Sequence, residues 1–305
     1  MTPMSGTEIP NGQGSRLGGC PREINQIFFD EGGGEESMRQ FALMLFLTTH
    51  SLISLAEFSV LTWNVDEISD PNPQRINRLL DRALSEQPDV ILFQEVEGST
   101  WEAMTRSAPL GSRYRMAYES SRAARPRGGL VTLYRADLKV DAPRYEKLPS
   151  EMGRGQLILP IQICSAMVQL ANVHLESPDV LFWRSRSYRS EQVETIKQRS
   201  ENGQPWIVAG DFNPVFESDA DRWFTRDWHD AWSEVHPNDP GLTWDPDQNS
   251  LAWRQGGFFL PGFRLDRLVY KARHFGALRA KVLGLGIEPP LSDHFGLRVD
   301  FSCHS

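Results

Sequence analysis

One short run of strand-like residues ends in a carboxylate and a carboxamide. Trp206 to Ala209 is apolar, Gly210 follows, and then come Asp211 and Asn213. Side chains alternate between the two faces of a strand, so Asp211 and Asn213 point to the same side. A buried acid costs several kcal/mol unless it is paired or binds a metal. Asp211 and Asn213 therefore either pair their polar groups at the end of a strand or form half of a functional site.

Polar side chains of the same kinds interrupt other apolar runs of the chain. In chain order they are Asn64, Glu95, His174 with Ser177, Asp266, and Asp293 with His294. A lone buried Asp or His is usually a satisfied core group. A whole series of interruptions rich in Asp, Glu, Asn and His is hard to explain as independent core groups. Strand ends that converge on one edge form sites in sheet-based folds, so we expect these residues to lie together.

The residue types suit a hard divalent cation and a phosphate. Carboxylates and amides without cysteine ligands favour Mg²⁺ or Mn²⁺ over zinc. Histidines beside such a cation can stabilise phosphate oxygens. The sequence has no GxxxxGK[ST] motif, so it is no P-loop nucleotidase, and it has no HExxH or GxSxG motif either. The set predicts metal-assisted hydrolysis of a phosphate ester.

Interleaved strands and helices must position these residues. The patterns predict strands at 58–65, 89–96, 113–120, 128–135, 155–163, 166–175, 206–213, 264–271, 277–285 and 295–302. They predict helices at 73–87, 99–108, 182–199 and 227–235, the second of them with a Ser/Thr cap. Several strand pairs follow one another directly, which favours a two-layered β core with helices outside, an α/β sandwich.

Composition limits the class of partner. The chain has 305 residues, of which 40% are hydrophobic, enough for one large domain or two small ones. The net charge of −8 gives no global basic field, so a phosphate-bearing partner must meet a local patch. Cys20, Cys164 and Cys303 are too few and too scattered for a disulfide framework or a zinc site, and we expect unpaired thiols.

Residues 1–57 are expected to be an N-terminal extension to a domain at 58–305. Residues 1–37 are rich in Gly, Pro, Ser and Glu, which predicts disorder. The next stretch is either an amphipathic helix packed on the domain or a signal peptide that begins at Met38. Its apolar run is interrupted at Thr48 to Ser51, which argues against a membrane span. The chain as given is expected inside the cell, and outside it if translation starts at Met38.

The motifs together resemble a known family. In order, "TWN", "QE", "H-x-E-S", "GDFN", "LDR" and "SDH" are similar to the endonuclease/exonuclease/phosphatase superfamily, over residues 58 to 302. Within it, "TWNVD", "HLES", "LTWDPDQN", "FRLDRLVY", "PLSDHFGL" and "KLPSEMGRGQLI" most resemble the branch of tyrosyl-DNA phosphodiesterase 2. The resemblance implies a DNase I-like fold, a four-layered α/β/β/α sandwich with two packed mixed β-sheets.

The resemblance also implies roles around a divalent cation, Mg²⁺ or Mn²⁺. Glu95 would be its direct ligand, Asn64 would help to hold cation and phosphate, and Asp293 would lie beside it through water. Asp211 would orient and deprotonate the attacking water, and Asn213 would hold phosphate or water in place.

Other residues would contact the substrate. The resemblance implies that His174 and His294 donate to phosphoryl oxygens and that Ser177 adds a contact. Asp266 would hydrogen-bond His294 and keep it protonated. Trp244 would line the path of a single-stranded 5′ end, where its ring would stack on the bases. The Arg residues that could hold the DNA backbone are Arg122, Arg125, Arg127, Arg184, Arg186 and Arg189.

The implied substrate is DNA whose 5′ end is joined through phosphate to tyrosine, hydrolysed by a monomeric enzyme of DNA repair. Two alternatives remain. The first is another hydrolase of the same superfamily, acting on AP sites, on DNA generally, on inositol phosphates or on sphingomyelin. The second is a non-catalytic module that binds phosphate or DNA. Export from the cell would favour the first alternative, since an exported protein would rarely meet a trapped topoisomerase.

Overall fold

The computed structural model describes residues 58–119, 129–178, 182–214, 227–255 and 260–304. Residues 54–305 form one compact unit. The predictions for residues 1–57, including the signal peptide, lie outside the described residues. None of the helices described in these ranges has the length and apolar character needed to cross a membrane.

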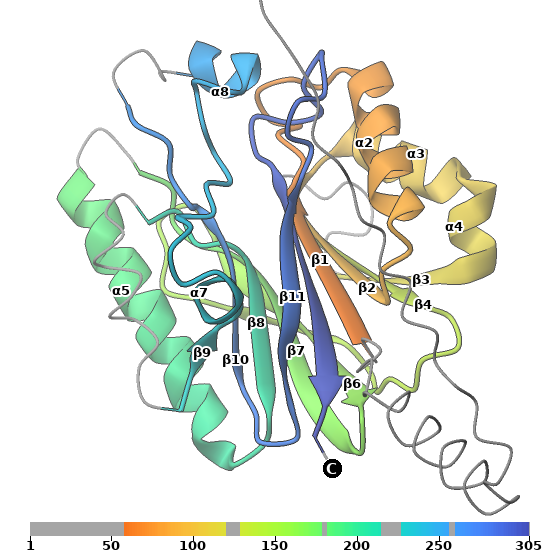
Figure 1. Cartoon of the computed structure of the whole chain (residues 1–305), viewed down its shortest axis with the longest axis vertical. Helices are drawn as coiled ribbons and strands as arrows, with labels where there is room; N and C mark the ends of the chain where they lie inside the picture. Colours follow the sequence, from red (N-terminus) through yellow and green to blue (C-terminus); the bar gives the residue numbers. More distant parts are fainter. Residues whose placement is uncertain (1–57, 120–128, 179–181, 215–226, 256–259, 305) are drawn as a thin grey trace, which may run out of the picture. The chain divides into compact units, whose positions relative to one another are not determined.

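Two six-stranded sheets form the centre of this unit (Figure 1). The first has the order β11-β12-β1-β2-β4-β3, and the second has the order β5-β6-β7-β8-β10-β9. The strands of the first sheet are β1 (Phe58–Asn64), β2 (Val90–Val96), β3 (Tyr114–Tyr118), β4 (Gly129–Arg135), β11 (Phe275–Leu283) and β12 (Gly296–Cys303). Those of the second are β5 (Arg144–Lys147), β6 (Gly155–Ile163), β7 (Ala166–His174), β8 (Trp206–Asp211), β9 (His229–Asp230) and β10 (Asp266–Lys271).

Both sheets are mixed, because each combines one parallel pair with antiparallel ones. The parallel pairs are β1 with β2 and β7 with β8. In a parallel pair both strands end at the same edge of the sheet. The polar residues that end β1 and β2 are therefore brought to one edge, and so are those that end β7 and β8.

Helices cover the outer face of each sheet (Figure 1). On the first sheet lie α2 (Pro73–Ser85), α3 (Gly98–Arg106) and α4 (Ala108–Arg113), and on the second lies α5 (Phe182–Arg199). The remaining short helices are η2 (Ser200–Asn202), α7 (Ala231–Val235) and α8 (Ser250–Arg254). This arrangement confirms the α/β/β/α sandwich.

Three apolar clusters fill the spaces between these layers. Val60 and Ile207, from different sheets, pack in the cluster between the sheets. Leu61, the next residue of β1, packs instead in the cluster beneath α2. Ile196 of α5 packs with Val208 on the far side. The alternation follows from the period of two along a strand, and strands buried on both faces read as continuous apolar runs.

The start of α3 differs from the prediction. No Ser or Thr caps it; the residue before it, Glu97, has no capping side chain. The buried carboxylate of Glu67 accepts hydrogen bonds from the backbone N–H groups of Ser99 and Thr100 instead. A carboxylate at a helix N-terminus satisfies free N–H groups and favours the helix dipole. The cap comes from a distant loop, so local sequence could not show it.

The prediction of unpaired thiols is wrong for two of the three cysteines. Cys164 and Cys303 form a disulfide, with Cα atoms 5.8 Å apart and a sequence separation of 139. It joins the turn between β6 and β7 to the end of β12, and so links the two sheets. Cys20 lies outside the described residues.

Candidate active site

The predicted polar residues meet where strands of both sheets end. Asn64 ends β1 and Glu95 lies near the end of β2. Across the sandwich, His174, Asp211 and Asp266 stand in register on β7, β8 and β10. One edge of the sandwich therefore gathers residues that are more than two hundred positions apart in the sequence.

Two backbone features aim the carboxylates. Gly210 has φ 145°, and a Cβ there would lie 1.9 Å from the carbonyl oxygen of Val173. Only glycine allows β7 and β8 to approach so closely just before Asp211. Glu95 has φ 57° beside an irregular register between β2 and β4. Such a bulge turns a side chain away from the regular alternation of the strand.

Polar contacts tie the two sheets together at this edge. The Asn64 amide donates to Glu95 Oε1 at 3.1 Å and to Asp211 Oδ2 at 3.1 Å, so it bridges the sheets. One layer deeper, Gln94 Nε2 donates to Asn172 Oδ1 at 2.8 Å. Buried amides that are hydrogen-bonded on both sides fix the spacing of the carboxylates.

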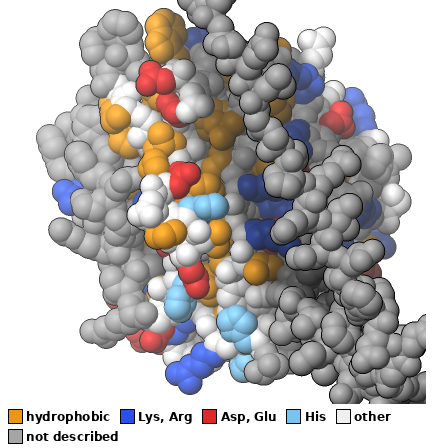
Figure 2. Space-filling model, viewed as in Figure 1, with side chains coloured by type: hydrophobic (Ala, Val, Ile, Leu, Met, Phe, Trp, Pro, Cys, Tyr) orange, Lys and Arg blue, Asp and Glu red, His pale blue; other side chains and the backbone are white. Residues whose placement is uncertain are grey.

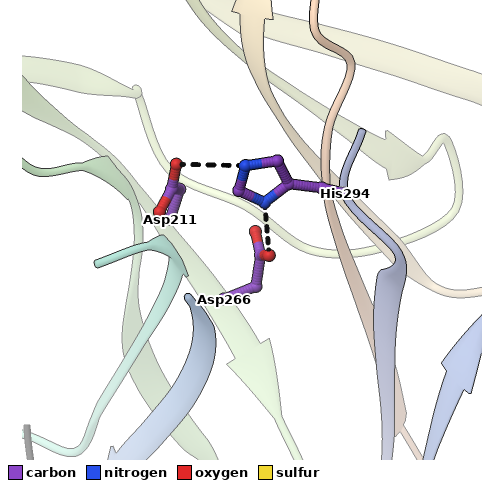
Figure 3. Close-up of side chains that lie close together, drawn as sticks. All are labelled: Asp211, Asp266 and His294. Atoms are coloured by element: carbon purple, nitrogen blue, oxygen red, sulfur yellow. Dashed lines mark hydrogen bonds and ion pairs between the residues drawn. The ribbon is translucent and has the colours of Figure 1, made fainter. Parts of the chain in front are cut away.

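His294 stands between two acids in the loop before β12 (Figure 3). Its Nδ1 lies 2.7 Å from Asp266 Oδ2, and its Nε2 lies 3.9 Å from Asp211 Oδ2. Burial lowers the pKa of His294, but Asp266, Asp293 and Asp211 together raise it well above its ordinary value. With its pKa raised in this way, His294 is a charged imidazolium with a hydrogen on both ring nitrogens, so Nδ1–H donates to Asp266 Oδ2 and Nε2–H faces the site. The predicted bond between Asp266 and His294 is present.

Burial and the proximity of other carboxylates raise the pKa values of the acids in this site. Burial raises the pKa of Asp211 to about 7, and Asp266 and Glu95 add to the rise. Burial likewise raises the pKa of Asp293 to about 7, with Asp66 and Glu95 adding to it. An acid with a pKa near 7 can accept a proton at neutral pH. The same crowding means that a cation would stabilise the ionised cluster.

His174 has a different partner. Its Nδ1 lies 2.9 Å from Arg154 Nη1, and its Nε2 lies 3.4 Å from Asp211 Oδ2. Burial and the Arg154 cation lower the pKa of His174 well below its ordinary value. Arg154 also donates to Ser177 Oγ at 2.7 Å, and Asn213 Nδ2 donates to the Leu175 carbonyl at 3.2 Å. The predicted residues His174, Ser177 and Asn213 thus lie along one side of the site.

The donor set fits a divalent cation. The buried Oδ2 of Asp66 has no hydrogen-bond partner among the described residues, and burial raises the pKa of Asp66. Asp66 raises the pKa of Glu95, and Asp66 and Glu95 together raise the pKa of Asp293, so the three carboxyl groups lie close enough to form one acidic group. Their ligand atoms are all oxygen, which suits Mg²⁺ or Mn²⁺.

Another set of possible ligand atoms, from Asp211, Asp266 and His294, lies within 4.8 Å of one another. Because Asp266 and His294 already bond each other, we place the candidate cation site at the end where Glu95 lies. The predicted ligand set of Glu95, Asn64 and Asp293 stays a prediction there.

The predicted DNA contacts are less well supported by position. Trp244 is 6% exposed and stacks with Phe263, so its ring is largely covered. Arg186 is exposed on α5. Arg189 is buried and donates to the Glu176 carbonyl at 2.9 Å, so its predicted contact with the DNA backbone is wrong. Of the other Arg residues named for this role, 122, 125 and 127 lie outside the described residues, and the side chain of 184 is not described.

Figure 2 shows Lys and Arg side chains gathered near the middle of one face. On β11 and β12 such residues include Lys281 and Arg298, and both form ion pairs with Glu86. These two cations therefore already have a carboxylate partner within the protein.

Three residues of the site were not predicted from the sequence: Arg154, Asp66 and Glu176. All three lie inside motifs that carried the resemblance, "KLPSEMGRGQLI", "TWNVD" and "HLES". The signal for Asp66 was an acid directly after a strand. Arg154 gave no such signal, because an arginine before a strand is ordinary on a protein surface.

The chain belongs to the Endonuclease/Exonuclease/phosphatase family, a family of hydrolases, which it matches over residues 61–294. That span contains every residue of the site. No curated protein matches the chain by sequence.

Solved structures show the same fold. A TDP2 from D. rerio complexed with single strand DNA product is 21% identical, with a TM-score of 0.69, over 80% of this chain and 98% of that one. A truncated Caenorhabditis elegans TDP2 is 21% identical, with a TM-score of 0.64, over 80% and 97%. The human Nocturnin catalytic domain with bound sulfate anion is 19% identical, with a TM-score of 0.58, over 81% and 94%.

Proposed function

We propose that the protein is a metal-dependent phosphodiesterase that hydrolyses 5′-phosphotyrosyl-DNA bonds and leaves 5′-phosphate ends. One observation carries the reaction type: Asp211, a buried acid with its pKa raised to about 7, lies beside two histidines that face the same space. A proton acceptor next to two donors matches the attack of water on a phosphoryl group.

Each residue has a step in this reaction. Asp211 takes the proton of the attacking water, and Asn213, whose backbone N–H donates to Asp211 Oδ1 at 2.9 Å, holds the strand end in place. His294 and His174 donate from Nε2 to the phosphoryl oxygens as negative charge develops there. Asp266 keeps His294 charged and oriented, since its carboxylate accepts from Nδ1.

Glu95, Asn64 and Asp293 are proposed to hold the cation, with Asp66 beside them. When bound, Mg²⁺ or Mn²⁺ would neutralise charge on the phosphate. A tyrosine leaving group needs little help from an acid, because its hydroxyl has a pKa of about 10. That chemistry is consistent with a site whose histidines serve the phosphoryl oxygens.

The substrate proposal rests on the motif resemblance, which runs through the whole site. The D. rerio TDP2 structure holds a single strand DNA product, and we extend that ligand class to this chain as a proposal. DNA repair, a monomeric state, and contacts from Ser177, Trp244 and Arg186 belong to the same proposal.

A second candidate is another phosphodiesterase of the same family that acts outside the cell. The disulfide between Cys164 and Cys303 favours it, because disulfides persist in oxidising compartments and are rare in the cytosol. Export would agree with a signal peptide at Met38. A phosphodiester other than a trapped topoisomerase adduct would then be the substrate.

A substrate panel separates the candidates. The purified chain with Mg²⁺ is given a 5′-tyrosyl oligonucleotide, an AP-site duplex, plain single-stranded DNA and an inositol polyphosphate. The first proposal expects the highest kcat/KM on the tyrosyl substrate, activity abolished by EDTA and restored by Mg²⁺ or Mn²⁺, and poor restoration by Ca²⁺. Highest kcat/KM on another substrate would support the second candidate, and no hydrolysis at all would favour a binding module.

A further inference from the structure

Arg154 contacts two of the groups that face the candidate phosphate site. It lies directly before β6, and its guanidinium reaches His174 Nδ1 through Nη1 at 2.9 Å and Ser177 Oγ through Nη2 at 2.7 Å. A guanidinium has only donors. Both contacted atoms must therefore accept hydrogen bonds from it.

This requirement decides where the hydrogens of His174 and Ser177 lie. Because Nδ1 of His174 accepts, the proton of its neutral ring is on Nε2. Nε2 is buried, has no hydrogen-bond partner among the described residues, and faces Asp211 Oδ2 at 3.4 Å. Because Ser177 Oγ accepts from Arg154, its own hydroxyl hydrogen is directed elsewhere. Each group is left with one hydrogen to offer a ligand.

The Nδ1 atom of His294 has the opposite kind of hydrogen-bond partner from that of His174. Its Nδ1 faces the acceptor Asp266 Oδ2 at 2.7 Å, whereas Nδ1 of His174 faces a donor. His294 has an Nε2–H because its ring is charged and carries hydrogens on both nitrogens, whereas the neutral ring of His174 has one because its Nδ1 accepts from Arg154. One ring needs a carboxylate behind it and the other an arginine.

A buried acid holds Arg154 in place. Glu176 is 2% exposed, and its Oε1 accepts from the backbone N–H groups of Glu151 and Met152 at 3.0 and 3.1 Å. Ser150 Oγ donates to Glu176 Oε2 and accepts from the Arg154 backbone N–H at 2.9 Å. The loop that carries Arg154 is thus anchored two residues from His174 in the chain, so the guanidinium has a fixed origin.

We propose that Arg154 is a positioning residue that fixes the hydrogens of His174 and Ser177, so that both present donors to a phosphoryl oxygen. The inference rests on the proposed function for its catalytic consequence, but the proton positions themselves follow from the contacts of Arg154. Ring-nitrogen orientation is a common way in which outer partners tune a site.

Side-chain NMR of the full chain labelled with ¹⁵N-histidine tests the proton positions directly. Long-range ¹H–¹⁵N spectra with Mg²⁺ present distinguish a pyridine-type from a pyrrole-type nitrogen, and His174→Gln assigns the signals among the seven histidines. The wild-type ring should show pyridine-type Nδ1 and pyrrole-type Nε2. A wild-type ring with its proton on Nδ1 overturns the proposal before any Arg154 variant is made.

Arg154→Met keeps the length of the side chain and removes the donors. The Nδ1 signal should then leave its pyridine-type position, because the ring exchanges between tautomers, and Arg154→Lys should restore it in part. Arg144→Met is the matched control: Arg144 lies on β5, is exposed, and pairs with Glu146, so its loss should leave the His174 signals unchanged. An unchanged spectrum in Arg154→Met contradicts the proposal, and an unfolded variant leaves the wild-type and Lys spectra to decide it.

Kinetics give the second readout. Arg154→Met should lower kcat by about 10–100-fold, the usual effect of losing such a partner, with part of the loss recovered in Arg154→Lys. A variant with the altered spectrum and normal kcat contradicts the catalytic consequence. If the wild-type chain hydrolyses no phosphodiester, the proposed function fails, while the spectra still decide whether Arg154 sets the proton on His174.

Discussion

Asp211→Asn tests the central claim about the reaction. The substitution removes a buried charge and keeps the shape of the side chain. The rise in the pKa of Asp211 from 3.8 to about 7 means that its ionised form is disfavoured by about 4 kcal/mol at roughly 1.36 kcal/mol per unit. The neutral amide relieves that cost.

The amide also introduces a mismatch. Asp211 Oδ2 accepts from the Asn64 amide and Oδ1 accepts from the Asn213 backbone N–H. An asparagine has one oxygen, so one of these donors would meet an NH₂ group, at a cost of about 1–3 kcal/mol. The relief is the larger effect, so we expect the free energy of unfolding of the metal-free variant to exceed that of wild type by about 1–3 kcal/mol.

Turnover should behave differently from stability. Loss of a positioned general base lowers kcat by roughly 10²–10⁴-fold, and DNA affinity should hold or increase because a carboxylate that repels phosphate is gone. The assay compares kcat on a 5′-tyrosyl oligonucleotide, DNA affinity and the melting temperature. Asp300→Asn is the control, since Asp300 pairs with Arg298 away from the site. Wild-type turnover in Asp211→Asn would rule out this residue as the base, and a loss of activity that only follows unfolding would mean that the residue is structural.

Glu95→Gln should raise the Mg²⁺ concentration needed for half-maximal activity, and an unchanged titration would place the ligand elsewhere. Trp244→Ala should raise KM for DNA by a factor worth about 1–3 kcal/mol and affect a thymidine nitrophenyl phosphodiester less; equal losses with a lower melting temperature would mean that Trp244 only packs against its neighbours. Cys303→Ser should lower the free energy of unfolding by about 2–5 kcal/mol, with a non-reducing thiol assay of the wild type as the check on the disulfide itself. Raised pKa values of Asp211 and Asp293, both about 7, stabilise the metal-free fold at low pH and lose that contribution as pH rises through 7. Metal-free protein should therefore melt lower at pH 8 than at pH 6, and Mg²⁺ should stabilise it more at pH 8; equal Mg²⁺ effects at both values would contradict this.

Local patterns in the sequence were sufficient for much of the architecture. Apolar runs with β-branched residues predicted ten of the twelve strands near their observed bounds, and the period of α2 predicted its buried face. The same patterns failed for β5, which has exposed or half-buried residues only, and for the two-residue β9, read as part of a helix. An element whose side chains are not buried leaves no periodic apolar signal.

The sequence also indicated which residues would gather at the candidate site. Acids, amides and histidines that interrupt apolar runs must be paired or bound, so Asn64, Glu95, Asp211, Asp266 and His294 could be grouped by type alone. Their order and spacing matched a family, and the structure brings all five to one edge.

Only the tertiary structure decided how these groups act. Arg154 is ordinary in sequence, and its contact with His174 exists because an anchored loop and the end of β7 meet. The pairing of Cys164 with Cys303 depends on the packing of one sheet against the other across 139 residues. The pKa values of Asp211 and Asp293 likewise depend on the burial and proximity that folding creates. Sequence fixes the chemical types, whereas distance and burial, which set protonation and pairing, arise only when remote segments pack together.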